Sequence, residues 1–439
     1  MISFLEVRTS DDKLIGKVWF DSDSDTYSFE YSVDWISSEG SYPVSPAIGF
    51  ESGAKSSTVK RFIDNLLPEG DGLDAIAQSG RISKSNTFAL IRTVGQESTG
   101  GLILTPPNFQ LEHNKQPARL VTDEELLSRI KERDVMPFSV WDGKVRLSIA
   151  GFQDKIAVFM DDGKMFLVEH PLASTHIVKP LPRNPELSTV VANEYYCMSF
   201  ADAVGLSAAR TQIHRIPEPV LIVERFDRKY NAKLLRVDRS HVIDGCQLLD
   251  MPPQYKYERN FGGGRDVAHI RDGASLKQLF ACAALSEMPM LFTQQLLRWT
   301  LFQYLVGNAD AHAKNLSFHV RPKGKIALSP AYDVVSTVIY NSLEDTMALS
   351  IGDEFKFEDV RAFQWATFAA DCHIPVKVLA TEMRRMATNA VKHVAQETVD
   401  ITSLTDQELK DIRRIQDFIV QQSAALLRDA ELVKKVQLG

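Results

Sequence analysis

The alternation of apolar and polar residues changes character along the chain. Every second residue from Tyr27 to Val33 is apolar, which is the period of a half-buried β-strand, and the acidic run at residues 21–25 predicts the turn of a hairpin before it. Beyond about residue 270 the pattern becomes mainly helical. It therefore predicts an α+β chain with a β-rich beginning and a mainly helical end.

Shorter runs predict further elements. A helix is expected over residues 59–67, where Pro68 stops it, and a strand over residues 102–104. Up to about residue 250 the chain is expected to be mixed, with one helix over residues 187–204. The strands of this mixed part are predicted at residues 146–149, 155–160, 165–169, 176–179 and 220–226.

Two helices of the C-terminal part are especially clear. The apolar run at residues 296–306 predicts a buried helix, with Gly307 as its C-cap. Thr405 and Glu408 form the sequence of a capping box. The helix that follows has Leu409, Ile412, Ile415, Phe418 and Ile419 on one face, and this face is expected to pack in the core.

A chain of 439 residues is long enough for two or three domains. The polar, proline-bearing stretch at residues 106–117 is interpreted as the main linker. The expected division is a β-rich N-terminal part (1–107), a mixed part (120–250) and a helical part (251–439). A β-rich part followed by a helical part is the order of a two-lobed kinase, in which ATP lies between the lobes.

Composition narrows the class of protein. The chain has 44% hydrophobic and 24% charged residues and a net charge of −7, which argues against a strongly basic surface for nucleic acid. No signal peptide and no apolar run of about 18 residues are apparent, so a cytoplasmic protein without a membrane partner is expected. The cysteines are far apart and lack zinc-ligand spacing, which favours reduced, buried thiols; they are Cys197, Cys246, Cys282 and Cys372.

The richest candidate chemistry follows Gly307. Asp310, Asn315 five residues later, and Asp333 further on are the residue types that kinase-type phosphoryl transfer needs. One acid orients the substrate hydroxyl, while the amide and the second acid hold magnesium on the ATP phosphates. The same residue types also cap helices and close turns, so this stretch alone leaves a catalytic loop and a polar turn open.

The order of weaker signals upstream favours the catalytic loop. A β–turn–β stretch around Gly151 can turn backbone N–H groups onto phosphates, and Lys179 ends a strand from which it can reach phosphates. Glu194 is a possible tether for that lysine, and residues 220–228 form an apolar strand of hinge type. Each of these four features has an ordinary alternative. In the same order, they are a plain hairpin, a solvated lysine, a surface glutamate and a sheet strand without a hinge role. Together the four features occur in the chain order of protein kinases.

Several strings resemble the HipA family of bacterial serine/threonine kinase toxins. They span nearly the whole chain and are residues 62–68, 148–155, 175–179, 193–196, 223–228, 246–247, 256–258 and 310–315. The resemblance implies an α+β, two-lobed protein-kinase-like fold with an N-terminal β-rich subdomain and a mainly helical C-terminal lobe. It also implies ATP and Mg²⁺ as cofactors.

The resemblance implies a role for each matching residue. Asp310 is the expected catalytic base, Asn315 and Asp333 are the expected magnesium ligands, and Ser148 is the expected site of inactivating autophosphorylation. A phosphate there would add about −1.5 to −2 charges where ATP phosphates should bind. The residues expected to bind ATP are Ala150, Gly151, Phe152, Gln153, Asp154, Lys155, Lys179, Glu224, Phe226, His312 and Lys314.

The resemblance also implies partners. The expected protein substrate is glutamyl-tRNA synthetase, whose inhibition halts translation and promotes persistence. The expected antitoxin is a helix-turn-helix protein of HipB type, which binds operator DNA and recruits the toxin as a corepressor. Two alternatives stay open: a kinase for a small molecule, and a catalytically silent transcriptional corepressor.

The chain departs from the family pattern in two places. Residues 151–155 read Gly-Phe-Gln-Asp-Lys where Gly-Ala-Gln-Glu-Lys is expected, so the ring of Phe152 enters the phosphate loop. Asp333 is followed by Val334 and Val335 and not by Phe-Gly. Switching by a flipping loop of eukaryotic type is therefore not predicted.

Overall fold

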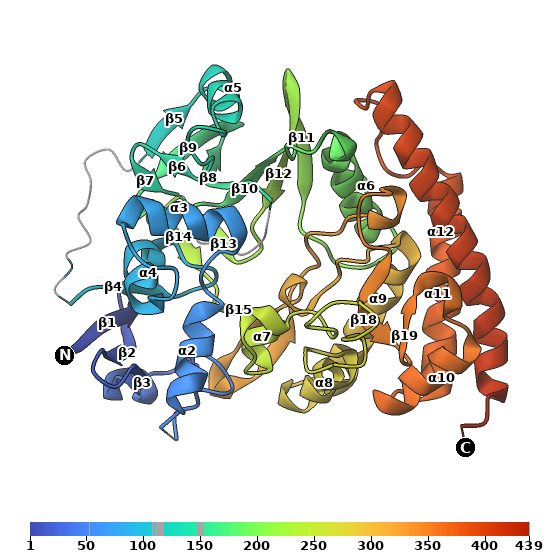
Figure 1. Cartoon of the computed structure of the whole chain (residues 1–439), viewed down its shortest axis with the longest axis horizontal. Helices are drawn as coiled ribbons and strands as arrows, with labels where there is room; N and C mark the ends of the chain where they lie inside the picture. The colour runs from blue at the N-terminus through green and yellow to red at the C-terminus, as the bar shows by residue number, and fades with distance from the viewer. Residues whose placement is uncertain (52, 108, 110–117, 147–152, 439) are drawn as a thin grey trace. The chain divides into compact units, whose positions relative to one another are not determined.

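The computed structural model describes residues 1–51, 53–107, 109, 118–146 and 153–438. The chain divides into two compact units (Figure 1). Unit 1 comprises Met1–Pro182, Gln212–Pro253 and Phe318–Ile326, and unit 2 comprises Arg183–Thr211, Gln254–Ser317 and Ala327–Gly439. The three-part division at residues 107, 120 and 250 stays a prediction.

Unit 1 begins with an antiparallel sheet in the order β3-β2-β1-β4, and the predicted hairpin turn at residues 21–25 joins β2 to β3. The strands are β1 (Ile2–Arg8), β2 (Leu14–Asp21), β3 (Thr26–Tyr31) and β4 (Ile103–Thr105). The helices between β3 and β4 are α1 (Val33–Ser37), α2 (Ser56–Asp64), α3 (Gly70–Gly80) and α4 (Thr87–Val94). The helix predicted at 59–67 is α2. The sequence did not predict α3, because Gly70 and Gly72 at its start are typical of a turn.

Unit 1 also contains a six-stranded sheet in the order β11-β12-β10-β8-β9-β5. Its strands are β5 (Ala118–Val121), β8 (Ile156–Asp161), β9 (Lys164–Val168), β10 (His176–Pro180), β11 (Thr211–Ile216) and β12 (Glu218–Glu224). Four of the five strands predicted between 146 and 226 are thereby confirmed. In the fifth, at 146–149, residues 147–149 lie outside the described residues.

The period of two along β10 gives the sheet two different faces. Val178 belongs to a core cluster with Ile156 and Val158 of β8 and with Leu126 of α5 (Asp123–Lys131). Lys179, the next residue, therefore points to the opposite face. Lys179 is thus on the face of the sheet away from the core cluster that contains Leu126, and its side chain is only 5% exposed.

Further strands form small sheets. They are β6 (Val140–Trp141) with β7 (Lys144–Val145), β13 (Arg228–Asn231) with β14 (Arg236–Arg239), and β15 (Val242–Asp244) with β16 (Ser317–Val320) and β17 (Ile326–Leu328). A short helix, α7 (Gly245–Leu248), follows β15 and begins with a capping box between Asp244 and Gln247.

A buried ion network ties the exit of β12 to the segment before β4. The Asp227 carboxylate accepts hydrogen bonds from Arg225 Nε at 3.0 Å, Arg228 Nη1 at 2.6 Å and Gly100 N–H at 3.1 Å. Arg228 also donates to the carbonyls of Gly100 and Ser98. Burial alone raises the pKa of Asp227, but the two guanidinium charges outweigh it and hold that pKa well below its usual range. The predicted hinge strand therefore ends in a fixed, charged corner.

His241 is the residue from which we expect acid sensitivity in unit 1. Its ring stacks on Tyr42 and its Nε2 bonds the Val44 carbonyl at 2.7 Å, and burial lowers its pKa from 6.5 to about 4. Because the folded pKa is depressed, the stability that the neutral ring contributes is complete above pH 6.5 and is lost as the pH falls towards 4. At pH 5 we expect a loss of about 2 kcal/mol from this group.

The measurement is the thermal unfolding midpoint at pH 7 and pH 5. The drop on acidification should be smaller in His241→Gln than in the wild type, because other titrating groups are common to both proteins. An equal drop in both proteins would contradict this account.

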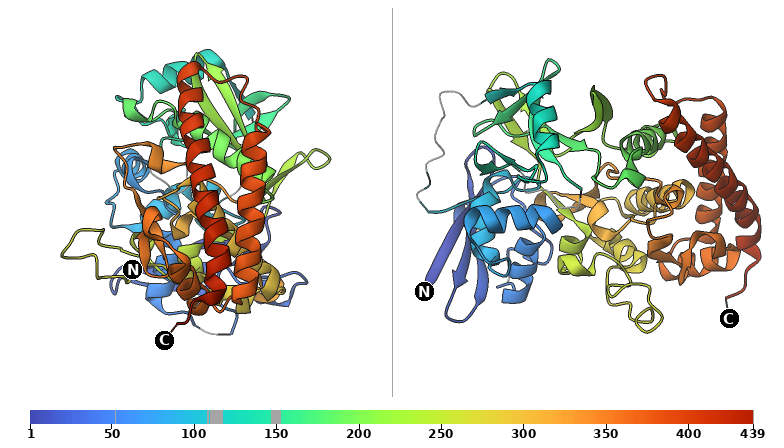
Figure 2. Two further views of the ribbon diagram at one scale, coloured as in Figure 1. Left: turned by 90° about the vertical axis from the view of Figure 1, so that its right-hand side faces the viewer. Right: turned by 45° about the horizontal axis from the view of Figure 1, so that its top comes forward.

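Unit 2 is mainly helical, as predicted for the C-terminal part. Its helices are α6 (Val190–Ala203), α8 (Leu276–Ala281), α9 (Pro289–Val306), α10 (Ala362–Asp371), α11 (Val376–Ala395) and α12 (Asp406–Leu432), and β18 (Thr346–Ile351) pairs with β19 (Glu354–Lys356). The long helices α11 and α12 lie side by side (Figure 2). The Thr405–Glu408 capping box is present at the start of α12.

The apolar run at 296–306 forms the second half of α9. Except for the half-buried Arg298, every residue of this run is buried, so α9 is the core helix that the sequence predicts. Arg298 donates to Glu382 of α11 at 3.0 Å, which pairs the one charge of the run.

The cysteines are free, as predicted; Cys197, Cys246 and Cys372 are buried, whereas Cys282 is half-buried. Within the described part of the chain, no helix is long and apolar enough to cross a membrane.

Candidate active site

The catalytic-loop candidate begins where α9 ends. Gly307 is the C-cap in the left-handed region (φ 69°), and its N–H donates back to α9. A Cβ at this position would lie 2.4 Å from Val338 and 2.7 Å from Phe418, so only glycine fits both the conformation and the space. The predicted glycine cap is thereby confirmed, and it directs the chain into residues 308–315.

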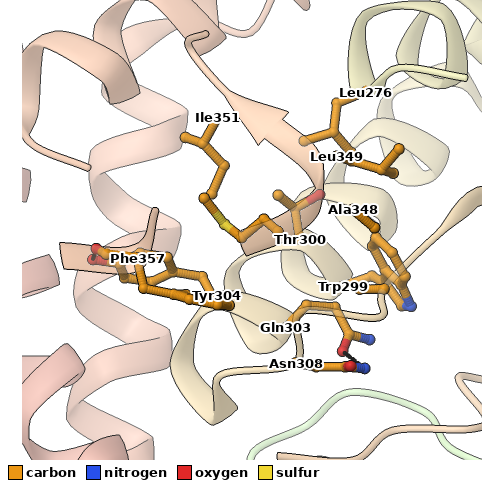
Figure 3. Close-up of a pocket in the computed structure, with 12 residues that line it drawn as sticks. Leu276, Trp299, Thr300, Gln303, Tyr304, Asn308, Ala348, Leu349, Ile351 and Phe357 are labelled. Carbon is orange, nitrogen blue, oxygen red and sulfur yellow. Dashed lines mark hydrogen bonds between the residues drawn. The ribbon is translucent and has the colours of Figure 1, made fainter. Parts of the chain in front are cut away.

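Buried hydrogen bonds clamp the start of this loop. Ala309 N–H donates to Thr337 Oγ1 at 2.7 Å, and Ala348 N–H donates to the Ala309 carbonyl at 2.9 Å. Asn308 Nδ2 donates to Gln303 Oε1 at 2.9 Å, beside a mostly apolar pocket between α9 and β18 (Figure 3). The loop is therefore rigid at its base.

Asp310 is the exception in this buried region. Of residues 301–318, it alone is exposed. Its N–H is held by Asn308 Oδ1 at 3.1 Å, and its carbonyl accepts from His312 N–H at 2.8 Å and from Asn315 Nδ2 at 3.0 Å. Tyr257 Oη donates to its Oδ1 at 2.6 Å. The fold thus presents one carboxylate to solvent from a fixed backbone.

His312 lies behind Asp310 among charged neighbours. Burial and the charge of Lys256 lower its pKa to about 3; Lys314 adds to this effect and Asp333 opposes it. The imidazole is therefore neutral at physiological pH. Its Nδ1 is buried without a hydrogen-bond partner, and Lys256 and Lys314 are exposed by only 6% and 5%. Positive charge and an unsatisfied ring nitrogen together suit an anionic ligand.

Asp333 and Asn315 stay the predicted magnesium ligands. Asp333 is held in the left-handed region (φ 57°), and the preceding Tyr332 bonds the Lys314 carbonyl at 2.7 Å. Because Asn315 Nδ2 donates to Asp310, its Oδ1 is the amide atom left for a metal. Among the described residues, no group of three or more His, Cys, Asp and Glu could hold a metal. Magnesium commonly completes its shell with phosphate oxygens and water, so one carboxylate and one amide suffice.

The candidate phosphate-binding residues that are described in unit 1 also come together. Gln153 Nε2 donates to the Pro180 carbonyl at 3.2 Å, next to Lys179 on β10. Asp154 Oδ2 lies 3.8 Å from Arg133 Nη1. The side chain of Lys155 is buried, with an exposed fraction of only 4%. The segment 153–155 is thus attached to the strand that carries Lys179. Ser148, Ala150, Gly151 and Phe152 lie outside the described residues.

The other predicted residues divide between the units. Glu224 ends β12 in register with His176, and Phe226 follows it with its ring 6.1 Å from His319, both in unit 1. Glu194 is in unit 2 on α6 and is exposed by only 2%, so the alternative of a surface glutamate is wrong. Its pairing with Lys179 and the ATP roles of Glu224 and Phe226 stay predictions.

Two family models match the chain. One is described as the HipA N-terminal domain and matches residues 5–105, and the other as the HipA-like C-terminal domain and matches residues 147–398. The chain belongs to the HipA family. Membership in this family of toxin kinases confirms the family that the short sequence strings predicted.

Relatives extend the match over the whole chain. The serine/threonine-protein kinase toxin HipA of Shewanella oneidensis is 36% identical over 428 residues, or 97% of each chain. The protein Y4mE of Sinorhizobium fredii is 31% identical over 93% of this chain and 94% of its own. A solved complex of Shewanella oneidensis HipA, HipB and operator DNA matches with a TM-score of 0.90 and 35% identity, over 99% of this chain and 100% of that chain. This match confirms the predicted α+β, protein-kinase-like fold class.

The structure also places residues in the site of this HipA-family chain to which the sequence assigned no role. Asn193 of α6 is fully buried; its side chain bonds both the N–H and the carbonyl of Ser336, and so fixes the backbone after Asp333. Lys256 and Tyr257 contact the candidate catalytic loop from a segment some fifty residues earlier. The strings 193–196 and 256–258 marked both places, but only the fold shows what they touch.

Proposed function

We propose that this chain is a cytoplasmic, ATP-dependent serine/threonine protein kinase of the toxin–antitoxin type. The observation that carries the proposal is Asp310, an exposed carboxylate on a clamped and otherwise buried loop. Asn315 donates a hydrogen bond to the backbone carbonyl of Asp310. The charge of Asp333 opposes the lowering of the pKa of the nearby His312, whose ring stays neutral. A turn that only caps a helix would not require this buried polar surrounding.

The proposed reaction moves one phosphoryl group. A serine or threonine oxygen of the substrate forms a bond to the γ-phosphorus of ATP, the bond from that phosphorus to the β,γ-bridging oxygen breaks, and ADP leaves. The hydroxyl proton passes to the Asp310 carboxylate, which also orients the attacking oxygen. The rigid base of the loop serves positioning, which supplies most of the catalysis in phosphoryl transfer.

Asn315 and Asp333 would hold Mg²⁺, which when bound neutralises charge on the ATP phosphates. His312 and Lys314 would face the same phosphates; the unpartnered Nδ1 of His312 and the burial of Lys314 support this. From unit 1, Lys179 and the 150–155 segment would contact phosphates, and Glu224 and Phe226 would offer hinge backbone to adenine.

The proposed substrate and partners follow from family membership. Glutamyl-tRNA synthetase would be the protein substrate, and its phosphorylation would inhibit translation and promote persistence. A HipB-type antitoxin would neutralise the kinase and provide most of the contact with operator DNA. The solved relative in complex with HipB and DNA supports this partner, and the net charge of −7 agrees with DNA affinity residing mainly in the antitoxin.

The autophosphorylation site is proposed to be Ser148. Ser148→Ala should lose self-labelling from γ-labelled ATP and should label its substrate as fast as the wild type or faster, because no anion then forms in the phosphate loop. Intact-protein mass before and after incubation with Mg²⁺ and ATP measures the first effect. If Ser148→Ala still gained the mass of one phosphate, the autophosphorylation site would be a residue other than Ser148.

A labelling experiment tests the substrate. The purified protein is incubated with γ-labelled ATP, Mg²⁺ and a cell lysate, and in parallel with purified glutamyl-tRNA synthetase. A labelled band at the size of the synthetase, and loss of aminoacylation by the purified enzyme, support the proposal. Label in a small-molecule fraction only would favour a small-molecule kinase, and no label anywhere would favour a silent corepressor.

A further inference from the structure

The segment Lys256–Glu258 lies directly against the catalytic loop inside unit 2. Ala313 N–H donates to the Lys256 carbonyl at 3.0 Å. The rings of Tyr257 and His312 meet edge to face, with centroids 5.1 Å apart and an interplanar angle of 85°. Tyr257 Oη then donates to Asp310 Oδ1 at 2.6 Å. Backbone, ring and hydroxyl thus contact three successive parts of the loop.

This segment is itself held in place. The Glu258 carboxylate, exposed by only 2%, accepts from Ser350 N–H at 2.7 Å and from Arg271 Nε at 2.9 Å. Gly273 packs so closely that a Cβ there would lie 1.8 Å from the Tyr257 carbonyl oxygen. The backbone of Tyr257 is therefore fixed, and its side chain has only two torsions left to define the position of Oη.

The side chain of Asp310 is held less tightly than its backbone. The backbone of Asp310 is clamped and its side chain is exposed, and each wrong orientation of the carboxylate lowers the fraction of molecules ready to react. A short hydrogen bond from a fixed phenol to this carboxylate restricts its rotation.

We propose that Tyr257 is a positioning residue of this kinase, whose hydroxyl holds the Asp310 carboxylate in the orientation that receives the substrate proton. This inference rests on the proposed role of Asp310. Tyr257 acts through Asp310 and makes no bond to the transferred group.

Tyr257→Phe is the appropriate variant, because it removes Oη and keeps the ring against His312. We expect kcat for phosphorylation of the protein substrate to fall between about tenfold and a hundredfold, the cost typical of a misplaced reacting group. The KM for ATP should stay within about twofold, because no predicted ATP contact is removed. Tyr255→Phe, two residues earlier in the same segment, is the matched control and should keep the wild-type kcat.

A double-mutant cycle separates positioning from a general structural role. In the Asp310→Asn background, measured by single turnover, adding Tyr257→Phe should change the residual rate less than about twofold, because the group it positions is already gone. An equal loss in both backgrounds, a wild-type rate in Tyr257→Phe, or a faster rate would overturn the inference. Equal rates for Asp310→Asn and wild type would instead refute the proposed function, so the two failures are distinguishable.

Discussion

Asp310→Asn is expected to abolish nearly all phosphoryl transfer while leaving the protein folded. The amide has the shape of the carboxylate but cannot take the substrate proton, and a general base contributes about 10²- to 10⁴-fold in rate. We therefore expect a fall in kcat of about 10³-fold with ATP binding largely retained. Single-turnover transfer from γ-labelled ATP and a separate nucleotide-binding titration measure the two quantities.

The geometry predicts that this loss is local. Asp310 is exposed and its backbone bonds do not involve its carboxylate, so the thermal midpoint should stay near that of the wild type. Asp345→Asn is a matched control, because Asp345 is an exposed aspartate of the same unit on the loop before β18. Asp345→Asn should keep the full rate. A comparable loss in both variants would remove Asp310 from the role of base.

Asp333→Asn is expected to produce the second large effect, on the requirement for magnesium. Replacing a charged ligand by a neutral one should raise the Mg²⁺ concentration for half-maximal rate at least about tenfold, a cost that even groups behind metal ligands show. Asparagine tolerates the left-handed conformation that Asp333 adopts (φ 57°), so the backbone should not change. Kinase rate as a function of Mg²⁺ concentration measures this effect.

A second substitution at the same place separates charge from backbone. Asp333→Ala removes the ligand and also strains the backbone, at a cost of about 1 kcal/mol or more. Because only alanine strains this backbone, Asp333→Ala should lower the thermal midpoint more than Asp333→Asn. An unchanged magnesium dependence in Asp333→Asn would show that Asp333 is no ligand, whatever the effect on stability.

Local patterns predicted most of the fold, for identifiable reasons. Four strands of the six-stranded sheet, the buried half of α9 and the capped start of α12 each have a period or a cap signal within a few residues. Helix α3 was missed because its first turn contains Gly70 and Gly72, and neighbouring structure outweighs that local signal. Nothing local reveals the order β11-β12-β10-β8-β9-β5, since it depends on pairings distant in sequence.

The candidate site was predictable where its residues stand in one short string. Asp310, His312, Lys314 and Asn315 were found this way, and the resemblance to a family gave them roles. Tyr257, Lys256 and Asn193 reach the loops of the site from other elements. A sequence shows neither their contacts nor the depressed pKa of His312, because burial and neighbouring charges come only with the tertiary structure.

One measurement tests the central claim most directly. The protein is incubated with Mg²⁺ and a substrate protein, once with ATP labelled at the γ-phosphate and once with ATP labelled at the α-phosphate, and the acid-stable label is assigned to an amino acid. The account predicts transfer of the γ-label alone, onto serine or threonine, and its loss in Asp310→Asn. Transfer of the α-label, label on another residue type, or no transfer from either nucleotide would contradict it.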